Sequence, residues 1–126
     1  MDVRRFSHRK LGILDLDLYD YAGAYGVKFG LSKADRLRYC EDSISHAVIL
    51  CGVHLEEGRP VRWRIENSWG EEEGNKGYFS MTDAWFGEYG YQVVIDKKLL
   101  SEEHLKILTQ MPVALPLWDA IGSSYL

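Results

Sequence analysis

Two neighbouring runs of residues carry the clearest pattern of hydrophobic and polar positions in the chain. From Ser45 to His54, apolar residues occupy both faces of an expected strand, a pattern typical of a strand at the centre of a sheet. Over residues 61–66, Val, Trp and Ile alternate with Arg, Arg and Glu, which predicts a second strand with one face in solvent. Because a charged connection containing Gly58 joins the two runs, the pattern predicts an antiparallel hairpin.

Shorter patterns predict further elements on both sides of this hairpin. Alternating Leu and Asp residues indicate a short extended segment within residues 11–31, where several glycines argue against a regular helix. The other expected elements each begin at a capping residue or coincide with a β-prone run. In chain order they are a helix from Ser32 to about Cys40, a strand at residues 77–81, a short aromatic helix after Thr82 or Asp83, a strand at residues 91–96 and a helix from Ser101 to about Thr109.

These elements predict an α+β fold with an antiparallel, partly rolled, barrel-like sheet and short flanking helices. Residues 1–31 are expected to form an irregular arm and an extended segment, and residues 32–111 are expected to hold the sheet. Because Met111-Pro112 ends the last helix, residues 112–126 are expected to form an extended C-terminal arm. Its expected anchors are Leu115, Leu117 and Trp118.

Composition and charge narrow the classes of function. The chain has 126 residues, 46% of them hydrophobic and 27% charged, which fits one soluble domain with a modest core. Its net charge of −4 argues against nucleic-acid binding by bulk attraction, and the basic cluster at residues 4–10 is expected to be a solvated arm. No apolar run approaches the ~20 residues of a membrane span. With two cysteines and no secretory signal, a cytoplasmic location is expected.

The predicted hairpin brings a histidine and an asparagine together. His46 opens the first apolar run and Asn67 follows the second, 21 positions later, so the two residues are expected to lie side by side. An Asn carbonyl that accepts the proton of one ring nitrogen fixes the tautomer and directs the other nitrogen outward, as in a base that serves a nucleophile. Trp69 is placed to cover that hydrogen bond. A lone His or Trp on an apolar strand is, however, more often an ordinary core residue.

Neither cysteine is expected to be the nucleophile. Cys51 lies five positions after His46, on the opposite face of a regular strand and roughly 16 Å away. Cys40 is expected at a helix C-terminus beside two carboxylates, where a thiolate is disfavoured. Cys51 and His54 lack the second pair of ligands that a tetrahedral metal site needs, so no metal or other cofactor is expected.

Longer motifs carry a resemblance to the papain-like cysteine proteases, most closely to their bleomycin hydrolase (aminopeptidase C) branch. The most specific stretch runs from residue 61 to residue 89, and weaker similarity upstream extends the likeness over nearly the whole chain. The matching runs are Trp-Arg-Ile-Glu-Asn-Ser-Trp-Gly-Glu at residues 63–71, Lys-Gly-Tyr at 76–78, Met-Thr-Asp-Ala-Trp-Phe-Gly-Glu-Tyr at 81–89 and Leu-Pro-Leu-Trp-Asp-Ala-Ile-Gly at 115–122.

The resemblance implies a role for each site residue. His46 and Asn67 take the places of the family's catalytic His and Asn, and Trp69 that of a supporting residue that shields them. The family's Cys nucleophile and oxyanion Gln belong to an earlier segment that this chain lacks. In the family, the C-terminal arm lies in the active-site cleft and limits the enzyme to aminopeptidase activity, which gives Leu126 a role in positioning the substrate amine. This chain departs from the family there, because Ala120 replaces Pro and the ending is bulkier.

Two hypotheses of function follow. In the first, the chain is the C-terminal part of a cytosolic cysteine aminopeptidase that removes N-terminal amino acids from peptides. Its partners are then peptide substrates, the missing Cys-bearing segment and other copies, since the resembled family forms hexamers. This chain alone is predicted to be inactive. In the second, the chain is a truncated fragment or pseudoenzyme that acts at most as a binding or assembly module.

Overall fold

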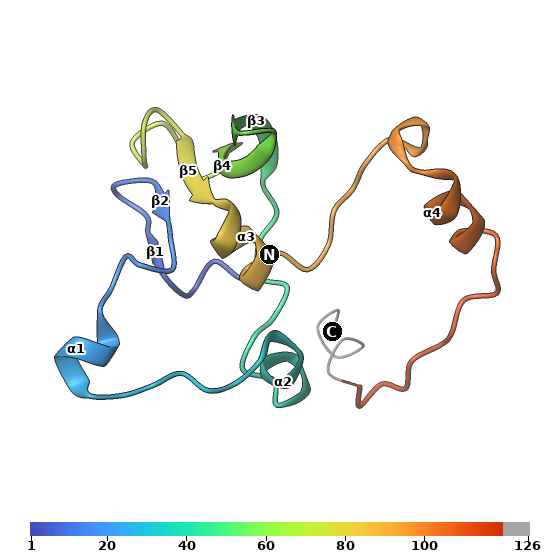
Figure 1. Cartoon of the computed structure of the whole chain (residues 1–126), viewed down its shortest axis with the longest axis horizontal. Helices are drawn as coiled ribbons and strands as arrows, with labels where there is room; N and C mark the ends of the chain where they lie inside the picture. The colour runs from blue at the N-terminus through green and yellow to red at the C-terminus, as the bar shows by residue number, and fades with distance from the viewer. Residues whose placement is uncertain (120–126) are drawn as a thin grey trace.

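The computed structural model describes residues 1–119, and it has the expected mixed α+β fold (Figure 1). Ten short elements follow one another within these 119 residues. In order they are β1 (Ser7–His8), β2 (Ile13–Leu14), α1 (Tyr21–Tyr25), α2 (Lys33–Arg38), β3 (Ile49–Glu56), β4 (Arg59–Glu66), β5 (Tyr78–Thr82), α3 (Asp83–Tyr89), the 3-10 turn η1 (Lys97–Leu99) and α4 (Glu102–Ile107).

One open sheet contains the five strands of the described chain, in the order β1-β2-β5-β4-β3. The predicted β3–β4 hairpin is confirmed, and its two-residue turn places Glu57 and Gly58 at φ 50° and 78°. Left-handed backbone at both turn positions matches the twist of the strands, which explains why a Gly stands in the second position. The β3–β4 and β4–β5 pairs are antiparallel, as expected. Strand β2, from the segment expected only to be extended, joins the same sheet and runs parallel to β5, with Ile13 opposite Ser80.

The core lies where helix α3 packs on β4 and β5. Ile65, Met81 and Trp85 have no exposed surface, and the arginines that alternate with Ile65 along β4 face solvent, as the sequence pattern predicts. Thr82 caps α3 by accepting a hydrogen bond from the backbone N–H of Trp85. Because Trp85 and Tyr89 are four residues apart, both rings lie on the buried face of the helix.

Strand β3 differs from its prediction. It begins at Ile49 rather than Ser45, and it is the exposed edge of the sheet rather than its centre. Before Ile49 the backbone bonds to the N-terminus instead of to β4, because the N–H groups of Ser45 and His46 donate to the carbonyl of Met1. Apolar residues on both faces of a strand therefore did not ensure burial here, since no other strand within residues 1–119 pairs with its outer edge.

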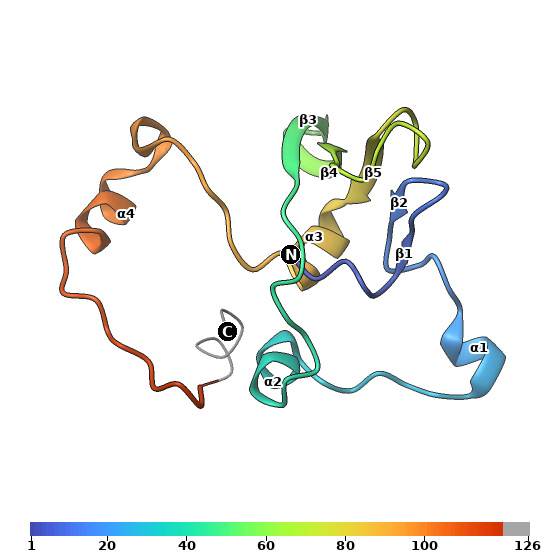
Figure 2. The same ribbon diagram turned by 180° about the vertical axis from the view of Figure 1, so that it is seen from behind.

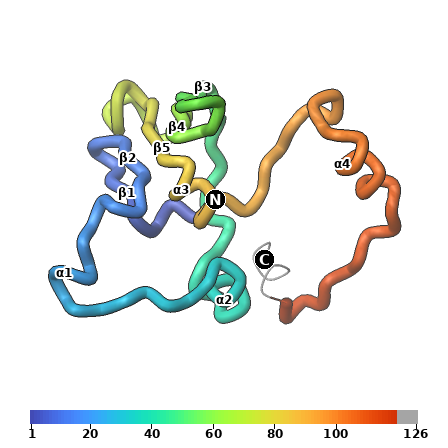
Figure 3. Tube along the Cα trace, viewed as in Figure 1, coloured from blue at the N-terminus to red at the C-terminus, as the bar shows by residue number. Residues whose placement is uncertain are grey.

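The prediction of a strand at residues 91–96 was wrong. The segment pairs with no strand in the described part of the chain, residues 92–96 are exposed, and Val94 is fully so. Figures 1 and 2 show that the chain leaves the sheet after α3 and continues as an arc that carries α4, and Figure 3 traces its path. High β propensity is therefore not sufficient to form a strand here, even though the outer edge of β3 is unpaired.

Most of the C-terminal arm lies on this arc. The expectation that Leu115, Leu117 and Trp118 anchor it was wrong, because all three side chains are exposed. The expected positioning residue Leu126, together with the rest of residues 120–126, lies outside the described part of the chain. Helix α4 itself begins as predicted, with Ser101 accepting from the backbone N–H of His104.

The N-terminal part is more ordered than its sequence indicates. Residues 1–10 are not a solvated arm, because they include β1 and the fully buried Asp2. Helix α1 forms a single turn in the glycine-containing stretch, and its cap Asp20 accepts from the N–H of Gly23 at 2.7 Å. Helix α2 follows its prediction, with Ser32 as the N-cap, and ends at Arg38.

Candidate active site

Backbone contacts fix His46 before β3 begins. Its N–H donates to the carbonyl of Met1 at 3.1 Å, and the amino group of Met1 donates to the carbonyl of His46 at 2.9 Å. The N-terminus lies beside the segment that leads into β3 in both views of the chain (Figures 1 and 2). This reciprocal pair of hydrogen bonds ties the His46 backbone to Met1.

Two buried carboxylates brace the segment that leads to His46. Asp2 accepts from the backbone N–H of Ser43 at 3.0 Å and forms an ion pair with Arg4 at 2.6 Å. Asp42 accepts from the guanidinium of Arg36 at 2.6 Å and from the hydroxyl of Tyr91. Residues 42–46 are therefore held from both sides before the chain reaches the imidazole.

The electrostatics of these carboxylates follow from their partners. Burial acts to raise the pKa of Asp2, but hydrogen bonds from Arg4 and Ser43 outweigh it, so this pKa lies below its ordinary value. Burial and the hydrogen bond to Asp42 both raise the pKa of Tyr91. Asp2 is consequently ionised, and Tyr91 protonated, at neutral pH.

The position of Asn67 is set at the end of β4. Its backbone N–H donates to the carbonyl of Gly77 at 3.0 Å, across the loop of residues 70–77. Gly77 has φ +83°, a left-handed conformation that favours glycine. Asn67 is also two residues beyond the buried Ile65, so its side chain continues the inward-facing phase of the strand and is half-buried.

His46 and Asn67 meet as the sequence pattern predicts. The imidazole Nε2 lies 2.8 Å from the Asn67 Oδ1. An amide oxygen only accepts, so Nε2 carries the hydrogen and donates it. In the neutral ring this leaves the lone pair on Nδ1, which forms no hydrogen bond within residues 1–119. The arrangement thus presents an oriented base with a free nitrogen.

Trp69 lies against the imidazole. The indole and the His46 ring are stacked, with their centroids 4.6 Å apart and an interplanar angle of 27°. Phe79 meets the indole edge-on at 5.7 Å, and the guanidinium carbon of Arg9 lies 4.7 Å from its centroid. Trp69 therefore covers the histidine. It is itself held by Phe79 of the core and by Arg9, which lies in the turn between β1 and β2.

Open space borders the pair on two sides. A hollow of about 420 Å³ is lined by His46, by β3 residues Ile49 and Leu50, and by Phe86 of α3. A smaller hollow of about 220 Å³ adjoins Asn67. His46 is thus half-buried but can be reached by another group.

Neither thiol of the described chain serves this site. Cys40 and Cys51 are free and exposed, and Cys51 Sγ donates to the carbonyl of Arg64 on the neighbouring strand. Within residues 1–119, no group of three or more His, Cys, Asp and Glu side chains is placed to hold a metal ion. The same residues contain no helix long and apolar enough to cross a membrane.

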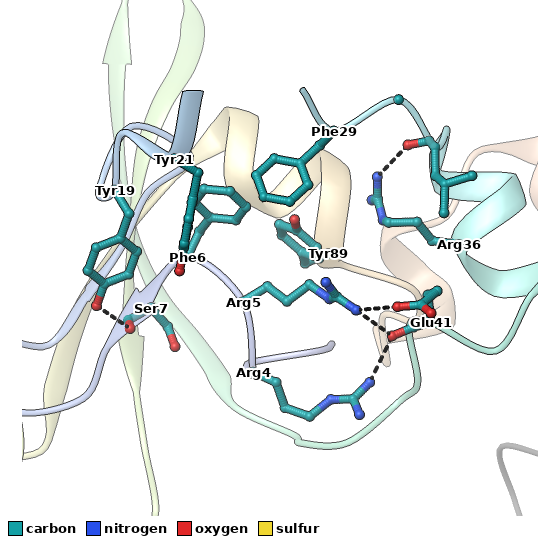
Figure 4. Close-up of a pocket in the computed structure, with 12 residues that line it drawn as sticks. Arg4, Arg5, Phe6, Ser7, Tyr19, Tyr21, Phe29, Arg36, Glu41 and Tyr89 are labelled. Carbon is teal, nitrogen blue, oxygen red and sulfur yellow. Dashed lines mark hydrogen bonds and ion pairs between the residues drawn. The ribbon is translucent and has the colours of Figure 1, made fainter. Parts of the chain in front are cut away.

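A larger cavity, of about 820 Å³, lies elsewhere (Figure 4). Phe6 lines this cavity and contacts three other aromatic rings of its wall. The ring centroids of Tyr21 and Phe29 lie 5.7 and 5.9 Å from that of Phe6, edge-on, and the Tyr89 ring is stacked at 6.3 Å. Its arginines already have carboxylate partners, such as Arg5 with Glu41 at 2.8 Å. This aromatic cluster holds residues 19–31 against α3, and it offers no unpaired charge to a ligand.

Sequence reasoning missed the contacts that residues 1–12 make with the site. Met1 binds the His46 backbone and Arg9 lies over Trp69, whereas the basic cluster had been expected to be solvated. No local sequence pattern predicts such contacts, because each joins residues at least 45 positions apart.

Comparisons with known proteins agree with the resemblance inferred from the motifs. Bleomycin hydrolase of Rattus norvegicus is 45% identical over 126 residues, and aminopeptidase C of Listeria monocytogenes is 43% identical over 122 residues. Each comparison covers 97% of this chain and 28% of the relative. The crystal structure of PepW from Lactobacillus rhamnosis HN001 matches with a TM-score of 0.88 and 44% identity, over 96% of this chain and 28% of that one.

The chain spans about 28% of the length of the curated relatives it matches. Their names confirm the likeness to bleomycin hydrolase and aminopeptidase C, and PepW confirms the fold. The model of the Peptidase C1-like family matches residues 1–122. Because that match takes in nearly every residue, the chain belongs to the Peptidase C1-like family.

Proposed function

We propose that this chain is the C-terminal, His- and Asn-bearing part of a papain-like cysteine aminopeptidase that removes N-terminal amino acids from peptides. The hydrogen bond of 2.8 Å between His46 Nε2 and Asn67 Oδ1 carries this proposal, since it fixes the orientation of an imidazole that lines an open hollow. The similarity to bleomycin hydrolase and aminopeptidase C supports the reaction class.

In the complete protein, a cysteine from another segment supplies the nucleophile. His46 Nδ1 takes the thiol proton, and the thiolate attacks the carbonyl carbon of the first peptide bond. As the tetrahedral intermediate collapses, the imidazolium returns the proton to the leaving amine, and an acyl-enzyme remains. His46 then activates the water that hydrolyses the thioester and restores the thiol. Asn67 holds the ring throughout, and Trp69 limits the access of water to their hydrogen bond.

The 126-residue chain alone is inactive under this proposal. Cys40 and Cys51 make no contact with His46, and the members of such a catalytic group act as a unit. The alternative is a non-catalytic fragment or pseudoenzyme that serves at most in binding or assembly. The exposed apolar residues of β3, such as Ile49 and Val53, favour contact with a further segment in either case.

The two functions are separated by an activity assay. The purified chain is incubated with a fluorogenic amino-acid amide and with a thiol-directed active-site label, and we expect neither turnover nor stoichiometric labelling. Turnover that the label blocks would contradict the inactivity of the chain. Adding the Cys-bearing segment is expected to restore activity, and His46→Ala is expected to abolish it. His54→Ala, on the exposed edge strand, is the matched control, and equal activity of both variants would refute the role of His46.

Further features belong to the proposed complete enzyme. Residues 112–126 form an arm toward the active-site cleft, where the Leu126 carboxylate pairs with the amine of the substrate. Removal of Leu126 should then raise KM for free amino-acid amides but not for substrates with a blocked amine. Peptides are the substrates, and the complete enzyme assembles as a homohexamer in the cytoplasm. The two free thiols are compatible with a reducing compartment.

A further inference from the structure

The turn between β1 and β2 is joined to the loop of residues 70–77 by several contacts. Arg9 Nε lies 3.2 Å from a Glu73 carboxylate oxygen, and Lys10 Nζ donates to the carbonyl of Glu72. The backbones approach so closely that a Cβ at Gly12 would lie 2.6 Å from Gly74 Cα. These contacts give the Arg9 side chain a defined position over the loop, although Arg9 itself is exposed.

The guanidinium of Arg9 meets the same indole that stacks on His46. Its central carbon lies 4.7 Å from the Trp69 ring centroid, within the range of a cation–π contact. Phe79 fixes the indole on the side of the core, by an edge-on contact at 5.7 Å. The indole is therefore held between three neighbours, of which only Arg9 carries a permanent charge.

We propose that Arg9 is a positioning residue, whose guanidinium, anchored by Glu73, keeps Trp69 stacked over the His46–Asn67 hydrogen bond. This inference rests on the proposed function of His46 as a base, because the hydrogen bond matters to catalysis only in that role. Arg9 touches neither His46 nor Asn67, and it acts through the indole alone. Without the cation, Trp69 keeps its contact with Phe79 but gains freedom to tilt away from the imidazole, and water reaches Nε2 more often.

A merely structural role for Arg9 makes a different prediction. If Arg9 only tied the turn to the loop, loss of any turn–loop contact would have the same effect as loss of Arg9. Lys10→Ala removes such a contact without touching Trp69. Arg64→Met removes a cation–π contact with Tyr78, at 3.9 Å, on the same sheet but away from the indole. These two variants are the matched controls.

The test measures how fast the His46 Nε2 hydrogen exchanges with solvent, by NMR of the isotope-labelled 126-residue chain. Arg9→Met keeps the apolar stem and removes the charge, so exchange is expected to accelerate about two- to fivefold, the factor of an exposed cation–π contact. Arg9→Lys restores a cation and should return the rate to near that of the parent chain. Both controls should leave it unchanged.

Several results would overturn the positioning role. They are an unchanged exchange rate in Arg9→Met, an equal acceleration in Lys10→Ala or Arg64→Met, and an Nε2 hydrogen that is unprotected in the parent chain. Because this readout needs no turnover, it stands apart from the test of catalysis. Loss of the catalytic role of His46 would appear in the activity assay, as full activity of His46→Ala, while the exchange result for Arg9 could still be obtained.

Discussion

Replacement of Asn67 by alanine tests the geometry on which the proposed base depends. The substitution removes the only acceptor that Nε2 of His46 has within residues 1–119, at 2.8 Å. A buried donor left without a partner costs about 1–3 kcal/mol, and the lower part of that range applies because the imidazole is half-buried and water can partly replace the amide. A loss of ~1–2 kcal/mol in transition-state stabilisation corresponds to a decrease in kcat/KM of about 5- to 30-fold.

The assay compares kcat/KM of the complete protein, with its Cys-bearing segment, toward an amino-acid amide. Ser68→Ala is the matched control, because Ser68 is adjacent and exposed. The decrease for Asn67→Ala should appear mainly in kcat, since Asn67 orients the base and contacts no substrate. An Asn67→Ala enzyme within twofold of the parent, in a protein that loses activity with His46→Ala, would refute the orienting role.

Three further predictions concern the framework, each read from denaturant unfolding. Gly12→Ala should destabilise the chain by about 1 kcal/mol more than Gly26→Ala, because both positions have positive φ but only the Cβ at 12 would collide with Gly74. Met81→Ala should cost about 2–5 kcal/mol by opening a cavity in the core. The folded-state pKa of Asp2 is depressed, so its stabilisation is complete above the ordinary value of 3.8 and is lost as the pH falls through the lower, folded-state value. Asp2→Asn should flatten that acid dependence.

Local patterns predicted the part of the molecule that holds the site residues. Alternation along residues 61–66 placed Ile65 inward, and the same phase carried Asn67 to the inner side. The Thr82 cap and the four-residue spacing of Trp85 and Tyr89 determined α3. Each of these features depends on neighbours in sequence or on one hairpin, so a single sequence suffices to read it.

The pairing and burial of other segments depend on contacts with residues far away in the sequence. Residues 49–55 have the composition of a central strand, yet β3 is an edge because nothing in the described chain covers it. Residues 91–96 have high β propensity, yet they pair with no strand of the described chain, although the outer edge of β3 is open. Conversely, the polar N-terminal residues are ordered because Asp2 accepts a hydrogen bond from Ser43 and forms an ion pair with Arg4 in the folded chain. Burial of this kind is a property of the assembled structure and leaves no local signal.

Within residues 1–119, the imidazole of the candidate site is already oriented, although neither cysteine lies beside it as a nucleophile. His46 is held by Met1, Asn67 by Gly77, and Trp69 by Phe79 and Arg9, so each contact comes from within residues 1–79. The tautomer and direction of the imidazole thus do not depend on the Cys-bearing segment. Under the proposed function, that segment supplies the thiol and the oxyanion donor, with the thiol facing Nδ1. Positioning a base in advance lowers the cost of ordering it in the transition state, and under the proposed function this is what the chain contributes to the complete enzyme.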